Sequence, residues 1–120
     1  MIDHVGFEVS ELSRSAAFYD AVFRALGARR MLDSEHAIAY GTNGPEVWIV
    51  VRGLAPAPGY GHLALSASGK AAVDAAYAGG LANGGTDDGP PGQRPQYGRR
   101  YYAAYMRDPD GLRVEVTSRR

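Results

Sequence analysis

The chain repeats its own pattern at an interval of 58 residues. In both halves a histidine opens an alternating, strand-like run, and a serine, a tyrosine and a glycine follow at matching positions. The matched pairs are His4 and His62, Ser10 and Ser68, Tyr19 and Tyr77, and Gly27 and Gly85. Such a repeat indicates an internal duplication of one structural unit. Two copies are needed because a single unit of this length cannot bury the face of its own sheet. We therefore expect two copies of one supersecondary unit packed around a shared core.

Each half predicts one strand, one helix and three further strands. Val5, Phe7 and Val9 alternate with small or polar residues, which is typical of a half-buried strand. Apolar residues then recur at helical spacing from Leu12 to Leu26, and Ser10 is the expected N-cap. We expect an α+β fold made of two tandem βαβββ modules in one domain, with module one at 1–53, a Pro- and Gly-rich linker at 54–60 and module two at 61–120. Within module two, residues 86–98 are predicted to form a long loop.

The composition excludes several classes of protein. The 120 residues carry no formal net charge, and the paired arginines are scattered, so no basic stripe for nucleic acid is expected. The absence of cysteine excludes disulfides, thiolate metal sites and cysteine nucleophiles. No basic leader and no run of about 18 apolar residues is present, which favours a cytoplasmic protein without a membrane partner.

Three polar side chains are expected on the faces of the strands that the helices do not cover. His4 and His62 lie opposite the apolar positions of their strands, and Glu115 alternates with Val114 and Val116. Two imidazoles and one carboxylate can hold Fe(II), Mn(II), Zn(II) or Ni(II) and leave positions open for a substrate. Spacing alone favours two hydrogen-bonded strand histidines and a surface glutamate over a metal site, and both interpretations stay open at this point.

The segments IDHVGFEVSELSRSAAFYDAV, GHLALSA and YYAAYMRDPDGLRVEV resemble the glyoxalase, bleomycin-resistance and extradiol-dioxygenase superfamily, the vicinal oxygen chelate fold. The resemblance covers essentially the whole chain. Its most specific parts are the histidine that opens each half and the DPDG turn followed by Glu115. It implies a U-shaped half-barrel sheet with the helices on its outer face, in a homodimer. It also implies a divalent metal, with His4, His62 and Glu115 as ligands.

The chain departs from three branches of that superfamily. Glyoxalase I has a fourth ligand, a glutamate, where this chain reads EVWIVV, so Trp48 or Ile49 takes that place and true glyoxalase I activity is not expected. Extradiol dioxygenases have a tyrosine ten residues before the glutamate, as Tyr105 is here, but also an acid–base histidine that VWIVV lacks. Fosfomycin-resistance transferases have a threonine where this chain has Gly6.

The resemblance therefore leads to two functional hypotheses. The first is a glyoxalase- or dioxygenase-type metalloenzyme, a lyase, isomerase or oxygenase, acting on a small substrate with vicinal oxygens. Its expected catalytic residues are Tyr105 and His36, and its expected substrate-binding residues are Trp48, Tyr101, Arg99 and Arg100. The alternative is a metal-free protein that binds a small molecule between aromatic walls, as bleomycin-resistance proteins do.

Overall fold

The computed structural model describes residues 1–120 apart from the side chain of Tyr60. The first half contains β1 (Val5–Glu8), α1 (Leu12–Ala25), β2 (Arg29–Asp33), β3 (Ala37–Gly41) and β4 (Val47–Val50). A short 3-10 helix, η1 (Pro58–Tyr60), lies in the expected linker. The second half contains β5 (His62–Ser66), α2 (Lys70–Ala82), β6 (Thr86–Asp87), β7 (Gly92–Gln93), β8 (Tyr102–Arg107) and β9 (Arg113–Ser118).

The two halves form two mixed sheets with the same strand arrangement. The orders are β1-β4-β3-β2 and β5-β9-β8-β6, and the pairs β1/β4 and β5/β9 are parallel. The segment expected to be a long loop, residues 86–98, instead contains β6 and β7, which both pair with β8. β6 and β7 together form one interrupted strand along the free edge of β8. They take the place that β2 has in the first sheet. The predicted α+β class with two βαβββ units is therefore confirmed.

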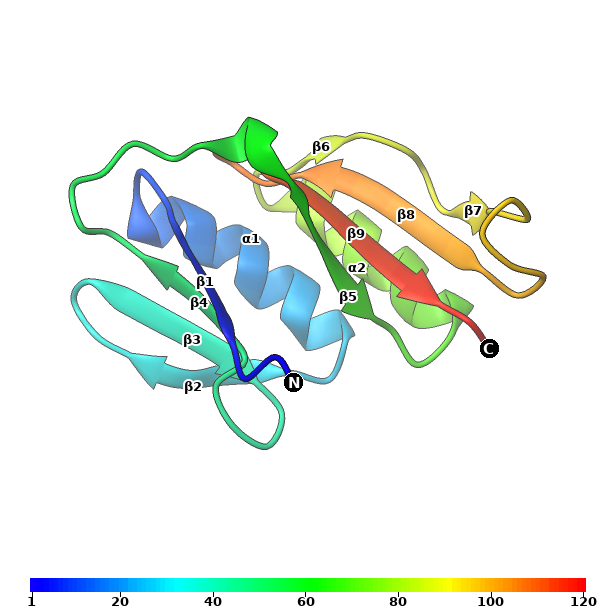
Figure 1. Ribbon diagram of the computed structural model, residues 1–120, viewed down its shortest axis with the longest axis horizontal. Coiled ribbons are helices and arrows are strands. Elements are labelled where there is room, and N and C mark those ends of the chain that lie inside the picture. The colour runs from blue at the N-terminus through cyan, green and yellow to red at the C-terminus, as the bar shows by residue number, and fades with distance from the viewer.

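Both helices lie against the same side of the sheets. Figure 1 shows the two sheets side by side as an open, uncurled surface, and not as the U-shaped half-barrel that the resemblance implies, with α1 and α2 behind it. Phe18, Tyr19 and Val22 of α1 and Val73 of α2 are fully buried against the strands. Gly80 of α2 lies so close to α1 that an added Cβ would stand 3.0 Å from the Phe18 ring, so the missing side chain allows the helices to touch. Among the described residues, no helix has the length and apolar character needed to cross a membrane.

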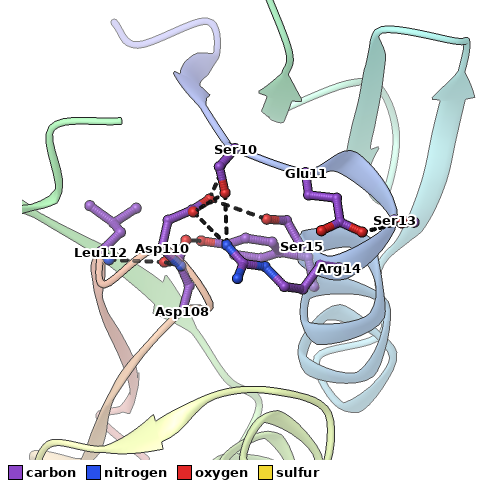
Figure 2. Close-up of polar contacts among 9 residues, drawn as sticks. Ser10, Glu11, Ser13, Arg14, Ser15, Asp108, Asp110 and Leu112 are labelled. Carbon is purple, nitrogen blue, oxygen red and sulfur yellow. Dashed lines mark hydrogen bonds and ion pairs between the residues drawn. The ribbon is translucent and has the colours of Figure 1, made fainter. Parts of the chain in front are cut away.

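A group of polar side chains joins the start of α1 to the turn between β8 and β9 (Figure 2). Ser10 donates hydrogen bonds to Asp110 from its backbone N–H, at 2.9 Å, and from its hydroxyl, at 2.5 Å. Arg14 donates to the same carboxylate at 2.8 Å. The expectation that Ser10 caps α1 is wrong, because Glu11 is the N-cap and the Ser10 side chain turns to the second half of the chain.

Asp108, in the same turn, is buried beneath this contact. It accepts a hydrogen bond from the Tyr19 hydroxyl at 2.7 Å and from the backbone N–H groups of Asp110 and Leu112 at 2.9 Å each. Gly111 completes the turn with a φ of 92°, a left-handed conformation that suits glycine. Because β9 starts two residues later, the turn ties the position of that strand to α1.

Candidate functional site

The second sheet presents a row of chemically active side chains on the face turned away from the helices, here called the open face. The register places Glu115 of β9 between Ala64 of β5 and Tyr105 of β8. Val114 and Val116, the neighbours of Glu115 along the strand, are fully buried on the opposite, helix-covered face. The alternation of the strand therefore directs the carboxylate to the open face, as the sequence predicts.

Glu115 is enclosed there although it lies opposite the helices. Its side chain is only 5% exposed, and the Tyr101 hydroxyl donates a hydrogen bond to Oε2. The other carboxylate oxygen, Oε1, lies 3.4 Å from Nε2 of His62. The structure thus brings His62 and Glu115 together, with Tyr101 holding the carboxylate from its second oxygen.

The two tyrosines next to Glu115 keep their protons more firmly than a free phenol does. The hydrogen bond to Glu115, and then burial, raise the pKa of Tyr101. Burial, and then the negative charge of Glu115, raise the pKa of Tyr105. Both hydroxyls are therefore donors at neutral pH, and neither is suited to act as a base.

His4 lies on the first half of the chain, just before β1, and faces the same cleft as His62. The cleft has a volume of about 730 Å³ and runs between the start of β1 and the whole length of β5, the edge strands of the two sheets. Nδ1 of His4 lies 2.6 Å from the Asp3 carboxylate, so Nε2 is the nitrogen left for a ligand. Within the described residues, no three His, Asp or Glu side chains gather closely enough to hold one metal ion.

The donors present on the second sheet fit a divalent metal in part. Two ligand atoms about 2.1 Å from one tetrahedral ion stand about 3.4 Å apart, which matches the separation of Nε2 of His62 and Oε1 of Glu115. Metal-binding carboxylates and imidazoles are usually held by a second hydrogen bond, and Tyr101 and Asp3 supply such bonds to Glu115 and His4. His62 and Glu115 can therefore hold two positions of an ion, and His4 is available as a third donor.

The register also decides what stands where a fourth ligand would be. Gly6 pairs with Trp48 as Ala64 pairs with Glu115, and Gly6 and Ala64 are equivalent positions of the repeat. Trp48, not Ile49, is thus the counterpart of Glu115 in the first half. An indole cannot ligate a metal, and here it provides an aromatic surface on the open face beside Gly6.

The remaining residues expected at the site lie elsewhere. His36 precedes β3 and its side chain is 72% exposed. Its carbonyl accepts a hydrogen bond from the Val51 N–H, just after β4 and away from the Val47 end that lines the cleft, so His36 does not reach the cleft. Arg99 and Arg100 are exposed in the turn before β8.

Two arginines near the site were not among the expected residues. The alternation of β9 places Arg113 on the same face as Glu115, so the strand pattern could have identified it. Arg94 follows β7 in the segment that was expected to be a loop, and no local signal in the sequence marks it.

Comparison with known proteins gives consistent results. A family model described as the Glyoxalase/Bleomycin resistance protein/Dioxygenase superfamily matches residues 1–116. A glyoxalase/bleomycin resistance protein from Albidiferax ferrireducens T118 is 32% identical, with a TM-score of 0.86 over 96% of each chain. No curated protein matches the chain.

Two further solved structures come from functionally named proteins. A lactoylglutathione lyase from Agrobacterium tumefaciens is 25% identical, with a TM-score of 0.69 over 98% of this chain and 92% of that chain. The fosfomycin resistance protein FosX from Listeria monocytogenes is 20% identical, with a TM-score of 0.73 over 98% of this chain and 92% of that chain, and at that identity the likeness concerns the fold alone.

Proposed function

Because the chain belongs to the glyoxalase/bleomycin resistance protein/dioxygenase superfamily, we propose that it is a metal-dependent enzyme acting on a small substrate with vicinal oxygens. The observation that supports this most is the pair formed by His62 and Glu115, with a donor–donor separation suited to one ion. Fe(II), Mn(II), Zn(II) and Ni(II) are the candidates, because imidazole and carboxylate donors accept each of them. When bound, such an ion supplies a Lewis acid that polarises a substrate oxygen.

The protein side chains have distinct tasks in this proposal. His62, Glu115 and His4 hold the ion, and Tyr101 fixes the orientation of the Glu115 carboxylate through Oε2. Tyr105 lies directly opposite Glu115 on β8 and keeps its proton, so its hydroxyl donates a hydrogen bond to an oxygen on which negative charge develops. The cleft of about 730 Å³ that His4 and His62 line is of a size that encloses a small molecule.

Trp48 supports a reaction other than that of glyoxalase I. A carboxylate at this position would add a ligand and a group able to move a proton, and an indole does neither. We therefore assign the protein to lyase, isomerase or oxygenase chemistry that needs three protein ligands and a substrate bound through its own oxygens.

We also propose that the protein acts as a homodimer of chains with one domain each. The sheets are open on one face. Among the described residues of one chain, His4 does not come close enough to His62 and Glu115 for the three to hold one ion. His4 therefore joins His62 and Glu115 either by a small movement within the chain or from a second copy. Mixing H4A chains with H62A chains separates these cases, because only pairing across copies restores one complete site in each mixed dimer.

Metal analysis tests the enzyme proposal directly. Protein purified without chelator should carry close to one ion per site, and H62A should lose it. The matched control is H36A, which removes an exposed histidine outside the cleft and should keep the ion. Y101F should weaken metal affinity by about 10- to 100-fold, since it removes the hydrogen bond that orients a ligand. A metal-free preparation that binds none of the four ions on titration would overturn the proposal.

The second candidate is a metal-free protein that binds a small molecule. It is favoured by the aromatic side chains near Glu115, where the Tyr97 and Tyr101 rings pack edge to face with centroids 5.5 Å apart and Tyr97 is largely exposed. Under this hypothesis an aromatic ligand would bind equally well with and without chelator, and H62A would bind it as the wild type does.

A further inference from the structure

Three arginines surround Tyr105 on the open face of the second sheet. The Arg113 guanidinium carbon lies 4.2 Å from the centre of the Tyr105 ring, and that of Arg94 lies 5.5 Å from it. Arg107 follows on the same strand face as Tyr105 and pairs in register with Arg113. Guanidinium groups stack well on aromatic rings, so the phenol ring is a platform that holds two of these cations in place.

The positive charge at this place exceeds the negative charge beside it. Asp88 is the carboxylate that pairs with both Arg113, at 2.9 Å, and Arg107, at 3.1 Å. Arg94 takes part in none of the ion pairs found among the described residues, and instead donates to the backbone carbonyl of Pro90 at 2.7 Å. With Glu115, which lies opposite Tyr105 in register, two carboxylates stand beside three guanidinium groups, and the remaining positive charge attracts an anion.

The segment between β6 and β7 holds Arg94 in its position. Gly89 has a φ of 143°, and an added Cβ there would stand 3.1 Å from the Tyr105 ring and 3.5 Å from the Arg94 guanidinium. Its carbonyl accepts from the Tyr105 N–H at 2.8 Å, while Asp88 N–H donates to the Tyr105 carbonyl at 2.9 Å. The backbone therefore lies directly against the ring and the cation. It leaves a pocket of about 310 Å³ whose lining includes Arg94, Arg113, Tyr97 and Tyr105, together with Asp88.

This pocket adjoins the pair proposed to hold the metal. Arg113 is two residues from Glu115 on the same strand face and is the register partner of His62 on β5. Tyr105, the floor beneath the guanidinium groups, is the register partner of Glu115 on β8. A small molecule can therefore place one end between the arginines and its other end next to His62 and Glu115.

We propose that Arg94 and Arg113 form a binding subsite for the oxyanion of a small substrate, a carboxylate or a phosphoryl group. Both groups accept two parallel hydrogen bonds from a guanidinium fork, which a neutral substrate group does not. As a statement about the substrate this inference rests on the proposed function, and it narrows the substrate class to anions. As a statement about anion binding it needs no metal.

The test is a titration of chelator-treated protein with sodium phosphate and, in a separate arm, with sodium acetate, at constant ionic strength. Binding is followed by NMR through the Nε–H signals of the arginines. We expect saturable shifts of the Arg94 and Arg113 signals, and the arm with the lower Kd identifies the phosphoryl or the carboxylate class. R94Q is the decisive variant because it leaves both ion pairs of Asp88 in place, and it should raise Kd at least about tenfold.

Matched variants distinguish this subsite from a general attraction of anions to surface arginines. R29Q, on β2 of the other sheet, should change Kd less than about twofold, and R113K should weaken binding although it keeps the charge, because lysine lacks the guanidinium fork. The proposal is overturned if the shifts do not saturate, if R94Q binds as the wild type does, or if the double variant R99Q/R100Q abolishes binding while R94Q retains it. H62A should keep the anion while losing the metal, so failure of either proposal can be recognised independently.

Discussion

Replacing Tyr19 by phenylalanine tests the buried hydrogen bond that joins α1 to the turn before β9. The Tyr19 side chain is fully buried, and its hydroxyl lies 2.7 Å from Oδ2 of Asp108. Burial, and then the charge of Asp108, raise the pKa of Tyr19 well above its usual value, so the hydroxyl remains a donor at any ordinary pH. Phenylalanine keeps the ring contacts, including the edge-to-face contact with Phe18 at 4.8 Å, and removes only the donor.

The size of the effect follows from what the substitution leaves behind. Asp108 keeps the two backbone hydrogen bonds to Oδ1, but Oδ2 becomes a buried acceptor that has lost its partner. Hydrogen bonds to a charged group contribute about 1.5–3 kcal/mol. We therefore expect Y19F to lower the free energy of unfolding by about 2 kcal/mol, measured by urea denaturation with circular dichroism and with an unchanged m-value.

Tyr102 provides the matched control. Its hydroxyl also lies 2.7 Å from a carboxylate, that of Asp74, but this pair is exposed to solvent. Y102F should cost less than about 0.5 kcal/mol, because water replaces the lost donor. If Y19F and Y102F were to lower the free energy of unfolding by the same amount, within about 0.5 kcal/mol, the reasoning from burial would be refuted.

Two further predictions concern helix contact and pH. G80A should destabilise the protein by about 1–2 kcal/mol despite the better helix propensity of alanine, because its Cβ would collide with side chains of α1 and β8. G79A, where the nearest atoms stand 3.5 Å away, should be neutral or stabilising by up to about 1 kcal/mol, and equal effects in urea denaturation would contradict this. The hydrogen bond from Arg52 lowers the pKa of Glu8 in the folded state, so the stability that Glu8 contributes is present above its unfolded pKa and lost as pH falls through the folded one. The free energy of unfolding should therefore fall more steeply for the wild type than for E8Q between about pH 5 and pH 3, and parallel curves would rule this out.

The order of the elements and the faces of the strands could be predicted from the sequence. The period-2 alternation in Val5, Phe7 and Val9 is a local property of an extended chain, and so is the alternation that sets Glu115 apart from Val114 and Val116. Once a helix covers one face of each sheet, the side of each strand residue follows. That is why His62 and Glu115 could be assigned to one face before any contact was known.

Register and close packing were decided only by the tertiary structure. Whether Trp48 or Ile49 stands opposite Gly6 depends on how β1 slides against β4, and a slide of one residue changes every pair without changing the pattern of either strand. The same holds for Ser10, whose local sequence favours a helix cap but whose hydroxyl binds Asp110, 100 residues away.

By itself, then, the sequence determined a duplicated βαβββ chain with His62 and Glu115 on the face that the helices leave uncovered, because helix and strand periods depend only on residues close together in the chain. Only the tertiary structure decided that Glu115 is enclosed by His62 and Tyr101, and that Arg94 from an interrupted edge strand meets Arg113 over Tyr105. The physical reason is that these contacts join residues far apart in the chain, and a local sequence pattern does not specify which distant residues come together.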